Sequence, residues 1–235
     1  PYDVAALPEC AKAFEDFKAG RTDQVPDVPF QMLTSLKLDS KAWRAIAARG
    51  GWQMVRMNLN TFQRHGVVDD AALTRKLADK LASPAEVRKA KVFPYQLMVA
   101  YVQADKDVPK RIREALHDAM EAALTNVPEI EGTVYVMPDV SGSMHSPVTG
   151  VRRGQTTAVR CIDVAALIAA AFLRKNRSAE VMPFHDRVLG CNLSGHDSVM
   201  TNAKRLASLP SGGTNCSAPL KELNRRKARG DLFVF

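Results

Sequence analysis

Val134-Tyr135-Val136-Met137-Pro138-Asp139-Val140-Ser141-Gly142-Ser143-Met144 is the stretch that decides the fold of this 235-residue chain. An apolar run rich in β-branched residues ends in the carboxylate of Asp139, and the hydroxyls of Ser141 and Ser143 follow at alternate positions. This order predicts a buried strand whose carboxyl end opens into a loop lined with oxygen atoms. Because ligands bind outside the carboxyl ends of strands in open α/β sheets, we expect a functional site at this loop.

A second loop of the same kind lies downstream, at Ser211-Gly212-Gly213-Thr214-Asn215, and it carries a third hydroxyl on Thr214. One carboxylate and three hydroxyls make an oxygen-only ligand set, which is typical of a Mg²⁺ ion that keeps several waters. A plain Ser/Gly turn after a strand is the alternative for Ser-Gly-Ser alone. The strand, the carboxylate and the second loop together favour the magnesium site.

Strands and helices alternate around these two loops. We predict strands at 133–137, 179–184 and 231–235, an optional edge strand at 187–189, and helices at 161–175, 197–209 and 217–229. This is the order of a doubly wound, Rossmann-like α/β sheet. The strand at 231–235 would be an unpaired apolar edge at the end of the sequence, so we expect the natural chain to be longer.

The first half of the chain follows helical periodicity instead. Trp52, Val55, Leu59 and Phe62 form one apolar stripe at helical spacing, and Asp39, Asp69 or Asp70, Pro84, Pro94 and Pro109 mark helix starts. Short helices with short connections predict paired helices, as in an α-solenoid. Since Pro128 interrupts this pattern, we expect a helical-repeat region over 1–128 and an α/β domain over 129–235.

Both halves together resemble the Ro ribonucleoprotein autoantigen family, in which a ring of HEAT-like helical repeats, the TROVE module, is closed by a von Willebrand factor A domain. The resemblance rests on Lys41–Ile46, Met54–Leu59 and Ala90–Leu97, and on Asp-Val-Ser-x-Ser-Met from Asp139 and Gly-Gly-Thr-x-Cys-Ser from Gly212. It covers roughly residues 25–235 and is nearest to bacterial members. It implies the C-terminal part of a TROVE-like module over 1–128 and a C-terminally incomplete A domain over 129–235.

In that family, the oxygen-lined loops form a metal-ion-dependent adhesion site for magnesium or a similar divalent cation. The resemblance carries this role to Asp139, Ser141, Ser143 and Thr214. The hydroxyl oxygens would reach the ion directly, and Asp139 would support them, in part through water. A partner's carboxylate would complete the octahedron. The family's further Asp, in a third loop, has no counterpart before the sequence ends.

The resemblance also implies a non-catalytic scaffold that acts in the cytoplasm in RNA quality control. Its expected partners are small non-coding RNA of the Y RNA type, structured or misfolded RNA, and an exoribonuclease. The alternative is a metal-dependent protein-interaction module without direct RNA binding. An enzyme that uses Asp139 for phosphoryl transfer is disfavoured, because Ser141 stands where a second carboxylate would be needed and no phosphate-binding lysine is near.

The distribution of charge is in line with a polyanionic partner. The chain carries a formal net charge of +8, and residues 131–235 alone hold 14 Lys and Arg against 8 Asp and Glu. The RNA-binding candidates are Arg56 and Arg64, expected on one face of one helix, and the cluster Arg88, Lys89 and Lys91. For each of these the alternative is a solvated helix face with cations near its C-terminus.

Two further basic groups receive less weight, and other classes of protein are disfavoured. Arg152 and Arg153 follow the metal loop, and Arg225, Arg226, Lys227 and Arg229 end a helix, where cations usually serve the helix dipole and solubility. No apolar run is long enough to cross a bilayer, so we expect no membrane partner. The four cysteines form no CxxC pair, which favours reduced thiols over a zinc site or a disulfide framework.

Overall fold

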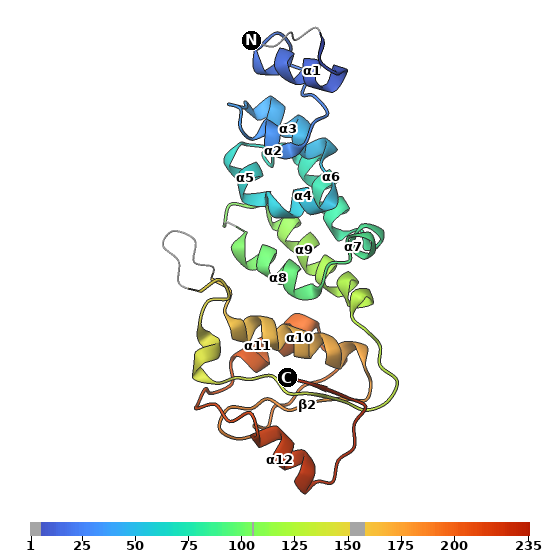
Figure 1. Cartoon of the computed structure of the whole chain (residues 1–235), viewed down its shortest axis with the longest axis vertical. Coiled ribbons are helices and arrows are strands. Elements are labelled where there is room, and N and C mark those ends of the chain that lie inside the picture. The colour runs from blue at the N-terminus through green and yellow to red at the C-terminus, as the bar shows by residue number, and fades with distance from the viewer. Residues whose placement is uncertain (1–5, 105, 151–157) are drawn as a thin grey trace. The chain divides into compact units, whose positions relative to one another are not determined.

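The computed structural model describes residues 6–104, 106–150 and 158–235 (Figure 1). The chain divides into two compact units, one made of residues 1–81 with 104–115 and the other of residues 82–103 with 116–235. No helix among the described residues has the length and hydropathy to cross a membrane.

The first unit is built from short helices. They are α1 (Glu9–Lys18), α2 (Phe30–Leu33), α3 (Ser40–Arg49), α4 (Trp52–Met57), α5 (Leu59–Arg64), most of α6 (Ala71–Ala82) and the first part of α9 (Lys110–Ala122). Two predicted helix starts are confirmed by their caps. The Asp39 carboxylate accepts the N–H of Ala42 at 2.7 Å, and Asp70 rather than Asp69 accepts the N–H of Leu73 at 2.9 Å.

The predicted apolar stripe is buried, but it does not lie on one helix. Trp52, Val55, Leu59 and Phe62 are each at most 4% exposed, and the Trp52 indole donates to the Leu81 carbonyl at 3.1 Å. Asn58 leaves the helical backbone region, with φ −115° and ψ 18°, and its side-chain amide donates to the Met54 carbonyl at 2.8 Å. The prediction that Arg56 and Arg64 share a helix is therefore wrong, because this break places them on α4 and α5.

The second unit begins with helices and continues into the α/β part. Its first elements are α7 (Pro84–Ala90), α8 (Pro94–Gln103), the rest of α9 and the 3₁₀ helix η2 (Ala123–Asn126). Pro84 and Pro94 open α7 and α8, and Pro109 precedes α9, so these three helix starts are confirmed. The remaining elements are η3 (Gly142–His145), α10 (Cys161–Lys175), α11 (Val199–Ala207) and α12 (Ala218–Arg225), with three strands between them.

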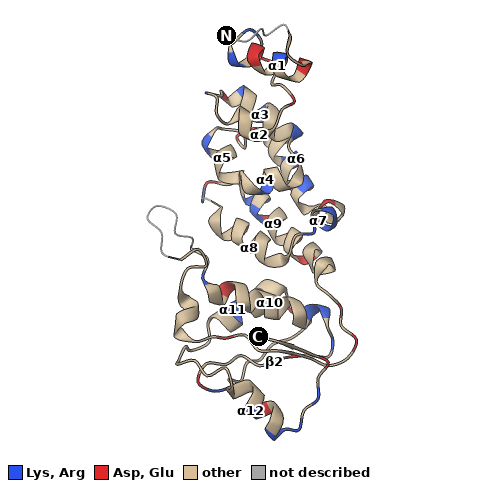
Figure 2. Ribbon diagram, viewed as in Figure 1, with Lys and Arg blue, Asp and Glu red and all other residues tan. Residues whose placement is uncertain are grey.

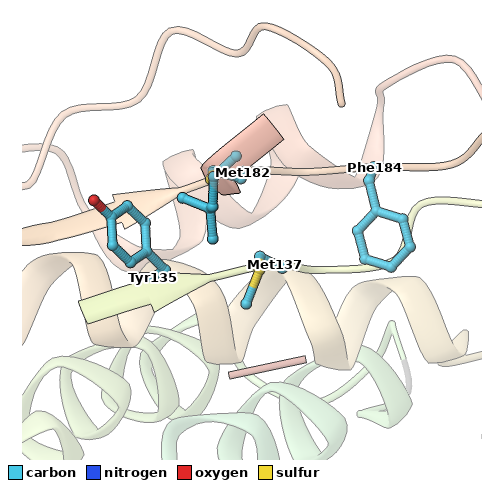
Figure 3. Packing of buried hydrophobic residues seen from close by; sticks show 5 residues of the cluster. Tyr135, Met137, Met182 and Phe184 are labelled. Atoms are coloured by element: carbon cyan, nitrogen blue, oxygen red, sulfur yellow. The ribbon is translucent and has the colours of Figure 1, made fainter. Parts of the chain in front are cut away.

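The strands β1 (Val134–Val136), β2 (Ala179–Val181) and β3 (Leu232–Val234) form a parallel sheet in the order β2-β1-β3. Helices α10 and α11 lie on one side of the sheet and α12 on the other (Figure 1). Toward α12, the buried residues Tyr135, Met137, Met182 and Phe184 pack together with Leu223 of that helix (Figure 3). The predicted mixture of helical and doubly wound α/β structure is confirmed.

The edge strand at 187–189 is not formed. The segment makes one isolated antiparallel bridge, between Phe184 and Val188, and the N–H of Leu189 donates to the Pro183 carbonyl at 2.8 Å. The other three strands are confirmed in place but are shorter than predicted, because regular pairing covers only three residues in each register.

Two side chains tie α9 and the connection at 128–130 to the α/β part of the second unit. Glu121 of α9 accepts the N–H of Val199, the first residue of α11, at 3.1 Å. The buried Asn176 accepts the N–H of Ile130 at 2.7 Å and donates to the Pro128 carbonyl at 3.3 Å. The change from helices to strands falls near 128, whereas the compact unit includes the helices on both sides of it.

Candidate functional site

The first oxygen-lined loop follows β1 directly. The Asp139 carboxylate accepts the backbone N–H of Ser141 at 2.7 Å, which folds the chain back on itself after the strand. Ser141 is fully buried, and its Oγ lies 3.2 Å from the Oγ of the exposed Ser143. Three of the four predicted ligand residues are therefore gathered in one turn. Asp139 contacts the backbone of that turn, as expected of a group that supports the hydroxyls.

The second loop is joined to the first by a backbone hydrogen bond. The N–H of Gly142 donates to the carbonyl oxygen of Gly212 at 3.0 Å. Thr214 follows two residues later and is exposed. The bond brings the loop that carries Thr214 beside the loop that carries Ser141 and Ser143. Sequence reasoning missed this role of the two glycines, since nothing in the local pattern pairs these positions.

His185 packs against the second loop. It is buried, at 6% exposure, just beyond the end of β2, and its carbonyl accepts the N–H of Asn215 at 2.8 Å. A Cβ atom added to Gly212 would lie 2.9 Å from the Nδ1 of His185. The absence of a side chain at Gly212 therefore lets the loop rest on the imidazole.

Beside the first loop lies a charged cluster made by Arg160, Asp163 and His145. Arg160 holds the Asp163 carboxylate at 3.1 Å and 2.7 Å and also donates to the Nδ1 of His145 at 3.0 Å. Burial by itself would raise the pKa of Asp163, but hydrogen bonds from Arg160 outweigh it and hold that pKa below its ordinary value. Since a guanidinium only donates, the Nδ1 of His145 is the acceptor in this arrangement.

The donor set of the two loops suits a hard cation. Among the residues that the structure describes, no group of three or more His, Cys, Asp or Glu is placed to hold a metal, so a zinc-type site of nitrogen and sulfur ligands is not formed there. Hydroxyl oxygens beside a single carboxylate are ligands that Mg²⁺ accepts when it keeps part of its water shell.

Two of the predicted RNA-binding residues lie apart from each other on the first unit. Arg56 is half-buried on α4, where its guanidinium lies 6.0 Å from the centre of the Trp52 ring and its Nε donates to Gln53 at 3.3 Å. Arg64 is exposed on α5 and donates to the Thr61 hydroxyl at 3.2 Å. Both arginines thus have local partners.

The other three, Arg88, Lys89 and Lys91, are gathered as predicted at the end of α7 (Figure 2). All three are exposed, and within the described ranges none of them forms an ion pair. Lys91 ends the helix in the left-handed region, with φ 49°, a conformation that glycine adopts more easily. Arg152 and Arg153 lie outside the described residues.

The chain is similar to known proteins in both sequence and structure. Residues 134–235 match the family model described as the Ro60 vWA domain. The RNA-binding protein RO60 of Deinococcus radiodurans is 25% identical over 240 residues, which cover 96% of this chain and 44% of the relative. The crystal structure of the RO (RSR) protein of the same organism superposes with a TM-score of 0.73 at 21% identity, over 95% of this chain and 46% of that one. The chain therefore spans less than half the length of these relatives.

Proposed function

We propose that the chain is a bacterial-type member of the Ro family and a non-catalytic scaffold that binds RNA. Its RNA partners would be small non-coding RNA of the Y RNA type and structured or misfolded RNA. It would act in RNA quality control in the cytoplasm, together with an exoribonuclease. The curated relative is named for binding RNA rather than for a reaction, which agrees with a non-catalytic role.

The observation that carries this proposal is the exposed basic cluster of Arg88, Lys89 and Lys91 at the end of α7, taken with the net charge of +8. None of the three cations has an ion-pair partner among the described residues, so all three are available to phosphates. Cations that contact phosphates position an RNA without reading its sequence. Such contacts suit a partner that is recognised by its shape and its single-stranded ends.

A magnesium ion at the two loops would be the second functional element. Ser141, Ser143 and Thr214 would hold the ion through their hydroxyl oxygens, with Asp139 in support. A bound ion would offer a coordination position to a carboxylate of a partner protein. The hydrogen bond from Ser141 to Asp139, which folds the first loop, and the bond from Gly142 to Gly212, which joins the two loops, support this assignment.

A metal-dependent protein-interaction module is the second candidate function, and the same two loops favour it. Titration of a fluorescent RNA hairpin with a single-stranded tail distinguishes the two candidates. If the chain is an RNA-binding scaffold, we expect the hairpin to bind saturably and to be displaced by unlabelled RNA of unrelated sequence. Absence of binding at low salt would leave the interaction module as the function of the chain.

A further inference from the structure

A groove of about 810 Å³ lies on the α12 side of the second unit, and Asn215 at the end of the second loop is part of its lining. One wall is formed by β2 and the segment 186–191, and the other wall is formed by α12. Its volume falls in the range of roughly 300–1,000 Å³ that is typical of ligand-binding clefts, which is room for one or two nucleotides. We call it the α12 groove.

Two of the three carboxylates that line the α12 groove are already paired with arginines. Glu180 receives two hydrogen bonds from Arg226, at 2.6 Å and 2.8 Å, and Glu222 receives two from Arg225, at 2.9 Å and 2.7 Å. The third carboxylate, that of Asp186, lies against the His185 ring. Glu180 and Glu222 therefore do not repel an anion at full strength, and Asp186 is the one carboxylate of the described lining that no Arg or Lys pairs.

The unpaired cations of the α12 groove outnumber its one unpaired carboxylate. Arg187 on one wall and Lys221 on the other are both exposed, and neither forms an ion pair within the part of the chain that the structure describes. Lys227 and Arg229 extend this charge beyond the end of α12 and are exposed as well. Two opposed walls that each carry an unpaired cation suit a ligand with repeated negative charges.

Lys227, which follows the end of α12, gives a second indication that the α12 groove binds an anion. Lys227 has a φ of 50°, in the left-handed region, while the N–H of the next residue, Ala228, donates to the Leu223 carbonyl at 3.0 Å. Glycine is the usual residue at this position of a helix end, because a Cβ atom is strained there. A lysine that keeps a strained position next to a basic groove indicates that its charge has a role.

We infer that the α12 groove is a second RNA-contact surface, which holds the backbone phosphates of a single-stranded segment through Arg187, Lys221 and Lys227. The inference rests on the proposed RNA binding and adds a contact on the A domain to the cluster on α7. No aromatic residue is among those described as lining the groove, so base stacking does not contribute. The contacts are therefore to phosphates, and they are independent of sequence.

The test compares two double variants of the same net charge. Arg187→Ala with Lys221→Ala removes the groove cations, whereas Arg177→Ala with Lys204→Ala removes two exposed cations of the same domain that do not line the groove. For a tailed hairpin, the groove variant is expected to bind several-fold more weakly than the control. Its plot of log affinity against log salt concentration should also be shallower by about 1.4, because each of the two lost single-strand phosphate contacts contributes roughly 0.7 to the slope.

The outcomes separate this inference from the proposed function. If the wild type binds RNA and both double variants bind alike, the α12 groove is not an RNA surface and only the inference is overturned. If the wild type binds no RNA, the proposed function and the inference both fail. A third outcome is that polyglutamate binds the wild type as tightly as RNA does and that this binding is lost in the groove variant. The occupant is then an acidic protein, and the RNA assignment is overturned.

A single variant tests the role of Lys227. Lys227→Gly relieves the backbone strain, so its thermal midpoint is expected to rise, while its RNA affinity is expected to fall and its salt slope to decrease by about 0.7. A raised midpoint with unchanged RNA affinity would show that the lysine contacts no RNA and would remove it from the surface.

Discussion

The backbone N–H of Gly142 donates a hydrogen bond of 3.0 Å to the carbonyl oxygen of Gly212. The two glycines lie far apart in the sequence, in the loops that follow β1 and that precede α12. Their bond joins the turn that carries Ser141 and Ser143 to the loop that carries Thr214. The proposed magnesium site depends on this connection, because neither loop alone provides enough oxygen ligands.

Removal of two hydroxyls tests the metal assignment. We expect Ser141→Ala with Ser143→Ala to weaken Mg²⁺ binding by at least about tenfold, since loss of ligands from a site of few donors leaves the ion with water alone on that side. Calorimetry, or paramagnetic broadening by Mn²⁺, measures the affinity. Ser211→Ala, at an exposed position in the second loop, is the matched control. Equal metal binding by the double variant and the wild type would show that these hydroxyls are not ligands.

Substitution of Gly212 tests the support of the second loop by His185. In Gly212→Ala the new Cβ atom would lie 2.9 Å from the Nδ1 of His185, so the loop or the ring must move. We expect Mg²⁺ affinity to fall roughly 10- to 100-fold, as it does when groups that orient metal ligands are changed.

Gly213→Ala is the matched control, since a Cβ atom there would meet nothing within 4 Å. Metal affinities that fall by the same amount in the two variants would contradict a specific contact between Gly212 and His185.

The pair formed by Arg160 and Asp163 predicts a dependence of stability on pH. The pKa of Asp163 in the folded protein is below its ordinary value. The contribution of Asp163 to the free energy of unfolding is therefore present above the unfolded pKa of about 3.9, and it is lost as the pH falls through the folded pKa. Asp163→Asn should lower the free energy of unfolding by about 1–2 kcal/mol at pH 7, and by less at pH 3. Urea denaturation at the two pH values measures this difference, and an equal loss at both would exclude the ionised carboxylate as the cause.

The contact between Glu121 and α11 predicts a loss of stability on a single change. Glu121→Ala leaves the N–H of Val199 without its acceptor at the first turn of α11, which should lower the free energy of unfolding by about 1 kcal/mol. Glu114→Ala on the same helix removes an exposed ion pair with Lys110 and should change it by only about 0–0.5 kcal/mol. Thermal unfolding measures the loss of stability in each variant, and equal midpoints for the two variants would contradict a capping role for Glu121.

Strong local signals made much of the fold predictable from the sequence. The helix at 161–175 has the predicted bounds, because a long apolar helix ends where Asn176 caps it. Asp39 and Asp70 mark true helix starts, since their side chains reach backbone N–H groups only three residues away. Local chemistry of this kind is visible in any single sequence.

Features that depend on distant contacts could not be predicted in this way. The break at Asn58 leaves the apolar stripe from Trp52 to Phe62 intact, so periodicity alone does not reveal it. The packing of Gly212 against His185 and the bond from Gly142 to Gly212 join segments from different loops. The candidate ligand residues were identified from their residue types, whereas the contacts that hold their loops required the structure.

Salt dependence of RNA binding tests the central claim, that this chain binds RNA through its basic cluster, most directly. A labelled tailed hairpin is titrated at several salt concentrations, with and without a chelator, for the wild type and for the variant with Arg88, Lys89 and Lys91 all replaced by Ala. We expect affinity to fall as salt rises, with a slope of log affinity against log salt of roughly 0.9 for each duplex phosphate contact. We expect the triple variant to bind all RNAs more weakly, and by about the same factor. Binding should persist in the chelator, because the metal loops are not part of that cluster. Salt-independent binding, or its complete loss in the chelator, would contradict the account.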